Sequence, residues 1–157
     1  MLPQYIVISE ELSHYFAIET SMLRNHLPVI DKDNFEFWTG GASGKLIITQ
    51  CQNCNLYIHP HSDICRRCHS RDLAPAALSG RGVISTYTIN HQVWEPGLET
   101  PYTVAIVTLE EQDGLNLTTN IVNCDPADVR IGMPVTVVFE QVEDVWLPLF
   151  EPSPART

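Results

Sequence analysis

Four cysteines between residues 51 and 68 are the side chains of this sequence best suited to chemistry. They form two Cys-x-x-Cys pairs, Cys51/Cys54 and Cys65/Cys68, with ten residues between the pairs. Each pair can form a tight turn that presents two thiolates to one ion, which is the spacing of a zinc-binding knuckle. Four thiolates complete a tetrahedral shell and leave no position for water or substrate. The sequence therefore predicts a structural Zn²⁺ site rather than a catalytic one.

Two alternatives use the same four thiols. Disulfides are one, but Met1-Leu-Pro-Gln does not begin a secretory signal peptide, so we expect a cytoplasmic chain, in which disulfides are rare. Iron of the rubredoxin type is the other, because a tetrahedral set of thiolates suits either metal. The nearby His59, His61 and His69 are expected to face solvent or to support the ligands, since the thiolates already fill the shell. Cys124 is predicted to be a free thiol in a loop.

Short strands must hold the two cysteine pairs in place. Residues 46–50 (LIITQ) and 55–59 (NLYIH) are rich in strand-forming residues and lie on either side of the first pair. Two strands and two knuckles around one ion predict a zinc ribbon. A ribbon of this size has almost no core, so the metal supplies much of its folding free energy. Residues 71–80 (RDLAPAALSG) are expected to form a linker.

Two helices are expected before the ribbon. Ser9 can cap the first, and Pro28 ends it. The second is expected at residues 31–40, with Asp31 as its cap and Gly40-Gly41 at its end. Apolar side chains recur at helical spacing in both, so the helices either cover the core or contact a partner. These side chains are Leu12, Tyr15, Phe16, Ile18, Met22 and Leu23 in the first helix, and Phe35 and Trp38 in the second.

After the ribbon the sequence changes to strand patterns separated by glycines. Gln112-Asp113-Gly114 predicts a compact hairpin turn between the second and third strands. The longest connection, at residues 124–133, separates the third strand from the fourth. Five strands with this connection outline an OB barrel, with a small β-sandwich as the alternative. The strands are expected at residues 82–94, 102–111, 115–123, 134–143 and 145–150.

The expected fold class is mainly β with N-terminal helices, a Cys₄ zinc ribbon and then a five-stranded OB-fold barrel. The expected boundaries are 1–43 for the helical segment, 44–72 for the ribbon and 73–157 for the OB-fold domain. No apolar run approaches the ~18 residues that a membrane-spanning helix needs, so no membrane contact is expected.

The formal net charge of −10 is unevenly distributed along the chain. Residues 82–157 contain eleven acids and only two arginines. OB barrels and zinc ribbons often bind nucleic acid, but a surface of this sign repels phosphate backbones. Binding of single-stranded nucleic acid is therefore the alternative function rather than the main one. The basic residues that flank the metal site are Lys45, Arg66, Arg67, Arg71 and Arg81.

Catalytic motifs are not evident. The sequence lacks both G-x-S-x-G and the phosphate-binding G-x-x-x-x-G-K-[ST]. Glu110-Glu111 stands beside a turn, where charged side chains are mostly exposed. His91 has the ordinary pKa range of a general base, although a histidine on a loop or barrel rim is the commoner case. The residues therefore favour a binding module over an enzyme.

One ordered set of motifs extends over about residues 30–152. It consists of Phe35/Phe37/Trp38, Gly44/Leu46, the four cysteines, Gly82/Ile84/Thr86/Tyr87/Thr88, Pro101/Tyr102, Ile131/Gly132/Met133 with Val135/Val137/Phe139, and Leu147/Pro148/Phe150. The cysteine spacing alone is shared by many ribbons, but the whole set resembles the DUF35 family. This resemblance implies an OB fold with a rubredoxin-like zinc ribbon. The first 30 residues lie outside the shared pattern.

The resemblance also implies a function. Members of the family are typically small partners of thiolase-superfamily enzymes, including acyltransferases, HMG-CoA synthase and aldolases that cleave steroid side-chain CoA thioesters. They complete or shield the acyl-CoA site, while the catalytic Cys and His belong to the partner. The closing stretch of this chain is most similar to the branch associated with steroid aldolases. The resemblance therefore implies a noncatalytic accessory subunit that shares acyl-CoA with a thiolase-fold enzyme, by analogy as a two-plus-two heterotetramer.

Candidate contacts follow from this implied function. The basic residues beside the metal site could meet the phosphates of CoA, with a solvated surface as the alternative for each of them. They are Lys45, Arg66, Arg67, Arg71 and Arg81. The expected partner interface includes Phe16, Phe35, Trp38 and His59. A stand-alone acyl-CoA hydrolase or carrier is a third hypothesis, for which the sequence offers no convincing nucleophile.

Overall fold

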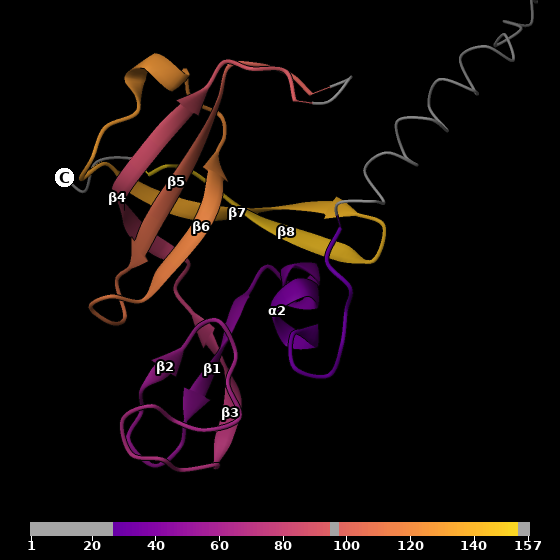
Figure 1. Cartoon of the computed structure of the whole chain (residues 1–157), viewed down its shortest axis with the longest axis vertical. Coiled ribbons are helices and arrows are strands. Elements are labelled where there is room, and N and C mark those ends of the chain that lie inside the picture. The colour runs from indigo at the N-terminus through magenta and orange to yellow at the C-terminus, as the bar shows by residue number, and fades with distance from the viewer. Residues whose placement is uncertain (1–26, 95–97, 154–157) are drawn as a thin grey trace, which may run out of the picture.

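The computed structural model describes residues 27–94 and 98–153, which form a small sheet at one end and a barrel at the other (Figure 1). In the small sheet, β1 (Leu46–Cys51) pairs antiparallel with β2 (Tyr57–Ile58) on one side and β3 (Leu73–Leu78) on the other. The cysteine pairs lie at the end of this sheet that is farther from the barrel.

The third strand of the small sheet corrects the prediction of a linker at residues 71–80. β3 pairs with β1 along its whole length, from Leu46 opposite Leu78 to Cys51 opposite Leu73. Its alanines and Pro75 are weak strand formers, but β1 offers it a complete ladder of backbone partners, and proline is tolerated on an edge strand. The boundary expected after residue 72 stays a prediction, although β3 continues the ribbon sheet to Leu78.

The predicted five-stranded barrel is confirmed. It closes in the order β4-β5-β6-β8-β7, in which the neighbours are antiparallel except for β6 and β8. The parallel contact joins Ile121 to Phe150, and Val122 N donates to Phe150 O at 2.8 Å beside it. The strands are β4 (Arg81–Asn90), β5 (Tyr102–Leu109), β6 (Asn116–Ile121), β7 (Pro134–Val142) and β8 (Val145–Pro152).

The connections also follow the sequence. Gly114, at φ +73°, lies in the hairpin between β5 and β6, as the Asp-Gly pair predicts. The long connection between β6 and β7 contains the short 3₁₀ helix η2 (Pro126–Asp128), and Asp125 caps it by accepting the N–H of Ala127. A closed barrel of five strands with this connection is the OB fold, so the sandwich alternative was wrong.

Burial alternates along the barrel strands, as a half-buried strand requires. In β5, for example, the side chains of Thr103, Ala105, Val107 and Leu109 are buried while their neighbours are partly exposed. The barrel core continues into the small sheet, because Leu46 and Ile48 of β1 belong to the same buried cluster as Phe150. A second, smaller cluster contains Cys51, Leu56, Ile58 and Cys65, with little apolar area of its own. We therefore expect this end of the ribbon to depend on the predicted metal ion for its stability.

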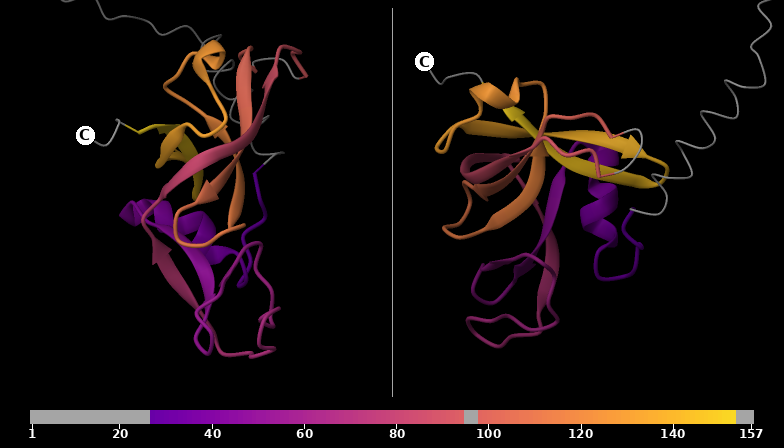
Figure 2. Two further views of the ribbon diagram at one scale, coloured as in Figure 1. Left: turned by 90° about the vertical axis from the view of Figure 1, so that its left-hand side faces the viewer. Right: turned by 45° about the horizontal axis from the view of Figure 1, so that its top comes forward.

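A short helix lies between the two units. The hairpin of β7 and β8 extends beyond the barrel and lies over α2 (Phe35–Thr39), which continues as the 3₁₀ helix η1 (Gly40–Ser43) (Figures 1 and 2). This differs from the prediction at residues 31–40 at both ends. Asn34, not Asp31, is the N-cap, because Asp31 Oδ1 accepts the N–H groups of Asp33 and Asn34 in the preceding turn.

The other end of the helical segment also differs from the prediction. The chain does not leave helical geometry at Gly40-Gly41 but only at Gly44, which has φ +67°. The first predicted helix, with Phe16, lies outside the described residues. Within residues 27–94 and 98–153, no helix combines the length and the apolar character needed to cross a membrane.

Candidate metal centre and the surfaces beside it

The four cysteines of the two pairs converge at one point. Their sulfurs lie within 4.8 Å of one another, with Cys51 Sγ 3.6 Å from Cys68 Sγ and Cys54 Sγ 3.5 Å from Cys65 Sγ. All four are free thiols, so the disulfide alternative was wrong. Four thiolates at ~2.3 Å from one tetrahedral Zn²⁺ ion would be about 3.8 Å apart, which is close to the observed spacing. The cluster therefore fits a closed four-coordinate metal site.

The two knuckles repeat one backbone pattern. In the first, Asn55 N donates to Cys51 O and Cys51 N donates to Leu56 O, both at 2.9 Å. In the second, His69 N donates to Cys65 O and Cys65 N donates to Ser70 O, again at 2.9 Å. The fourth residue after the first cysteine has a left-handed backbone in both, at φ 59° for Asn55 and 58° for His69. Asparagine and histidine tolerate this conformation better than most residues, which explains their positions.

Backbone donors around the second knuckle favour the thiolate form that binds metal. The side chain of Asn53 and the N–H of Ser70 lower the pKa of Cys68 to about 6. Burial raises the pKa of Cys65, but the N–H groups of Cys68 and Arg67, together with the thiols of Cys54 and Cys51, lower it overall, and Arg67 N lies 3.4 Å from Cys65 Sγ. The N–H of Leu56 lowers the pKa of Cys54, but burial and the neighbouring thiols raise it overall to about 12, so metal binding has to displace the proton of this fourth thiol. With that proton released, the donor set fits structural zinc with four thiolate ligands.

The histidines near the knuckles are not needed as ligands of this ion. His59 packs against Phe37, with ring centroids 5.0 Å apart, and burial lowers its pKa. Phe37 in turn meets Trp38 edge to face at 4.7 Å. Of the residues expected at a partner interface, Phe35 is 51% exposed, whereas Trp38 and His59 are partly buried within the molecule. Phe35 is thus the member of that set with the most free surface among the described residues.

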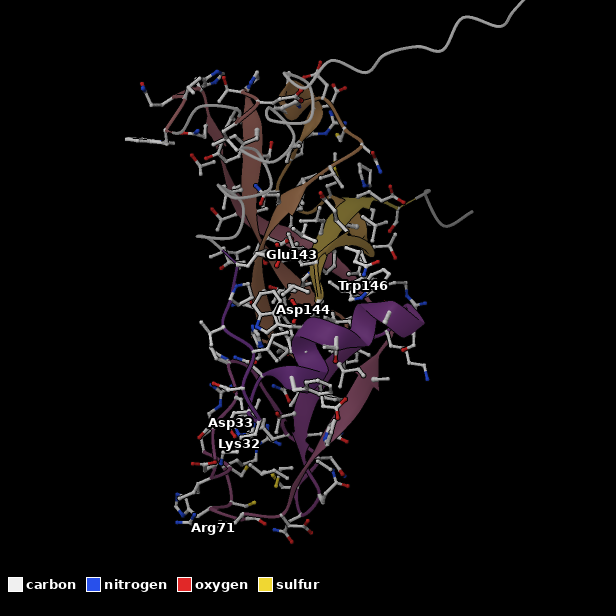
Figure 3. All side chains as sticks on the ribbon, turned by 90° about the vertical axis from the view of Figure 1, so that its right-hand side faces the viewer. Lys32, Asp33, Arg71, Glu143, Asp144 and Trp146 are labelled. Carbon is white, nitrogen blue, oxygen red and sulfur yellow. The ribbon has the colours of Figure 1, made fainter. Side chains whose placement is uncertain are left out.

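The five basic residues do not gather on one patch. Lys45 and Arg81 lie at the end of the ribbon sheet that meets the barrel, since they precede β1 and begin β4. Arg66, Arg67 and Arg71 lie at the knuckle end, and Figure 3 shows Arg71 at the far end of the ribbon. β1 has six residues, so the two ends are about 17 Å apart at the usual rise of a strand. Arg81 also forms an ion pair with Glu110.

Two features were missed by the reasoning from sequence. A pocket of about 160 Å³ lies between the segment around α2 and the ribbon sheet, lined by Phe37, Ile47, His59 and Pro75 among others. Asp33, His61 and Asp63 also come together at this edge. The sequence shows His61 and Asp63 two residues apart, which is a recognisable spacing for two metal ligands. Nothing in the sequence placed Asp33 beside them.

Known proteins resemble the chain over both the zinc ribbon and the OB-fold barrel. The rubredoxin-like zinc ribbon domain of ChsH2 matches residues 38–74, and the C-terminal OB-fold domain of ChsH2 matches residues 76–140. A solved structure described as "Ltp2-ChsH2(DUF35) aldolase" is 33% identical with a TM-score of 0.72, covering 80% of this chain and 98% of that chain.

Two curated relatives cover different shares of their own length. A DUF35 domain-containing scaffold protein of Methanocaldococcus jannaschii is 37% identical over 101 residues, which are 63% of this chain and 70% of the relative. A probable enoyl-CoA hydratase alpha subunit of Thermomonospora curvata is 33% identical over 127 residues, which are 80% of this chain. The match spans only 39% of that hydratase subunit.

Proposed function

Because the chain belongs to the DUF35 family, we propose that it is a noncatalytic accessory subunit of a thiolase-superfamily enzyme that acts on acyl-CoA. The observation that carries the proposal is the structural match to the DUF35 chain of an aldolase, over 98% of that chain. The names of the relatives, a hydratase alpha subunit and a scaffold protein, support a role inside an enzyme complex. Retro-aldol cleavage of a CoA thioester is the reaction that the aldolase match favours.

The side chains of the described residues support a noncatalytic role. A closed shell of four thiolates offers a substrate no coordination position. The paired carboxylates have structural partners, because Glu110 pairs with Arg81 and Glu111 Oε1 accepts the N–H of Ser79 at 2.6 Å. These contacts tie the start of β4 to the β5–β6 hairpin. The chain therefore contributes shape and contacts, and the partner contributes the reacting groups.

CoA phosphates are the proposed ligands of the basic residues at the knuckle end. Arg66 and Arg67 are exposed, and guanidinium groups bind phosphate through paired hydrogen bonds. Arg71 is exposed at the same end, while Lys45 lies about 17 Å away, by the rise of β1. Arg81 would have to leave Glu110 before it could bind a phosphate. Arg66 and Arg67 are accordingly the main candidates.

The proposal is tested by purifying the tagged chain from its native host and identifying the co-purified proteins by mass spectrometry. A stoichiometric subunit of the thiolase superfamily is expected, and by analogy a two-plus-two complex. The alternative function, binding of single-stranded nucleic acid, rests on the OB barrel and would appear as recovered nucleic acid. Nucleic acid that persists through a salt wash, without an enzyme partner, would overturn the proposal.

A further inference from the structure

Three metal-ligating side chains meet outside the thiolate cluster, where the segment before α2 reaches the loop between the knuckles. Asp33, His61 and Asp63 each present one ligand atom, and these atoms lie within 4.8 Å of one another. We propose that they bind one divalent transition-metal ion, of which Zn²⁺ is the natural example, separately from the ion of the cysteines. The site would clamp the segment before α2 onto the ribbon.

The distances between the three side chains suit a shared ion better than direct contact. His61 Nε2 lies 3.9 Å from Asp33 Oδ1 and 3.7 Å from Asp63 Oδ1. Both distances exceed the ~3.2 Å limit of a normal N–H···O hydrogen bond. Two ligands at ~2.1 Å from one tetrahedral ion are about 3.4 Å apart, so each carboxylate needs to approach His61 by about half an ångström or less. Asp63 can do so because its side chain is 76% exposed.

The orientation of His61 supports a ligand role. Its Nδ1 lies 2.9 Å from Thr49 Oγ1, and Thr49 is held in the central strand β1. When Nδ1–H donates to this hydroxyl, the lone pair of Nε2 faces the two carboxylates. Metal-binding histidines are oriented in this way by a hydrogen bond from the other ring nitrogen. The threonine lies outside the knuckles and is not required by the ion of the cysteines.

Asp33 is also positioned before any ion arrives. Its backbone N–H donates to Asp31 Oδ1 at 2.9 Å, in the turn that leads to α2. Its carboxylate lies 3.5 Å from Nζ of Lys32, a side chain that is 87% exposed (Figure 3). Because such a surface ion pair contributes little energy, Lys32 can yield its place to a divalent ion. The carboxylate would then bridge the two segments through the metal.

The ligand set also indicates the kind of ion. One imidazole and two carboxylates suit Zn²⁺ and its neighbours in the first transition row, and they lack the softness of the four-thiolate site. Three protein ligands leave at least one position for water. The 160 Å³ pocket lies beside the proposed ligands, because its lining includes both Asp33 and His61. The proposed role is to hold α2 against the ribbon, with no catalytic step assigned.

The test uses the full chain with its cysteine site already loaded with zinc. Co²⁺ is titrated to a large excess and binding is followed by calorimetry and visible absorption. We expect Co²⁺ to bind as a second metal equivalent, beyond the zinc on the cysteines. Its absorption spectrum should lack the intense thiolate charge-transfer bands of cobalt in a cysteine site. Asp63→Asn and His61→Gln should each weaken this second equivalent at least about tenfold, since each removes a ligand, and Thr49→Val should weaken it by a similar factor through the loss of orientation.

The matched control is His91→Gln, which changes an exposed histidine on the barrel side and should leave both equivalents unchanged. All variants should retain one zinc on the cysteines, which shows that the ribbon is folded. The proposal is overturned if the wild-type chain takes up no second ion. It is equally overturned if Asp63→Asn and His61→Gln bind the second ion as tightly as the wild type, because the ion would then lie elsewhere. If the three side chains form only an ion pair, with His61 protonated, the wild-type chain will take up no second ion.

Discussion

Gln112, in the hairpin between β5 and β6, uses both ends of its side-chain amide to bind the backbone of Tyr57 in β2. Its Oε1 accepts the N–H of Tyr57 at 2.9 Å, and its Nε2 donates to the carbonyl of Tyr57 at 3.1 Å. One side chain thus takes the place of a neighbouring strand on the free edge of β2. This contact links the barrel to the ribbon between residues that are 55 positions apart.

Replacement of Gln112 by alanine should loosen this link. The variant loses two partly buried hydrogen bonds and leaves the backbone groups of Tyr57 without them, which should lower the free energy of unfolding by about 1–3 kcal/mol. Chemical denaturation measures that change, and hydrogen exchange should show faster exchange at the amide of Tyr57. The control is Gln92→Ala, an exposed glutamine in another loop, which should have little effect. Equal stability and equal exchange in both variants would mean that the contact does not hold the units together.

Gly41 is expected to tolerate no side chain. An added Cβ would lie 2.5 Å from the Cβ of Trp146 and 2.6 Å from Cδ1 of Phe139, in the hairpin that covers the helical segment. Gly41→Ala should therefore destabilise the protein by about 1–3 kcal/mol, the usual cost of overpacking. Thermal or chemical unfolding followed by tryptophan fluorescence provides the measurement. Ala42→Ser, at the exposed next position, should be nearly neutral, and a neutral Gly41→Ala would show that the hairpin does not press on this turn.

Removal of the metal should unfold the knuckle end and spare the barrel. Cys51, Leu56, Ile58 and Cys65 form a small cluster separate from the main core, so they depend on the ion. A strong chelator is expected to abolish protection from hydrogen exchange at the amides of Asn55 and His69, which make the knuckle hydrogen bonds. Strands β5 and β8 should stay protected. If the knuckle amides kept their protection in a chain shown by elemental analysis to be metal-free, the metal would not be structural.

Charge reversal at the knuckle end tests the proposed CoA contact. In the purified complex, Arg66→Glu and Arg67→Glu should each raise KM for acyl-CoA by about tenfold or more, the scale of one hydrogen bond to a charged group. The rate at saturation should change little, because in the proposed complex the reacting groups belong to the partner. Arg130→Glu provides the control, since Arg130 is exposed in the long connection of the barrel. Unchanged KM in both knuckle variants would remove these arginines from the CoA site.

The sequence predicted those parts of the structure that depend on local patterns. The spacing of the four cysteines was sufficient to predict the metal cluster, and alternation with period two placed five barrel strands within a few residues of their bounds. Strand β3 was missed because its alanines and Pro75 have little intrinsic preference for a strand, and only the neighbouring β1 makes it one.

Contacts between distant segments were not predictable from the sequence. Gln112 reaches Tyr57, and Asp33 reaches His61, only because the barrel and the α2 segment are packed against the ribbon. The basic residues near the cysteines in sequence are separated in space, since the full length of β1 lies between Lys45 and the knuckles. Their grouping along the chain therefore overstated their grouping on the surface.

The central claim is that this chain completes an enzyme without being one. The most direct measurement compares acyl-CoA turnover by the zinc-loaded chain alone, by the complex purified with its partner, and by the partner after the chain is removed. We expect no turnover by the chain alone, full turnover by the complex, and loss of activity from the partner that is regained when the chain is added back. Turnover by the isolated chain, or a partner equally active without it, would contradict the claim.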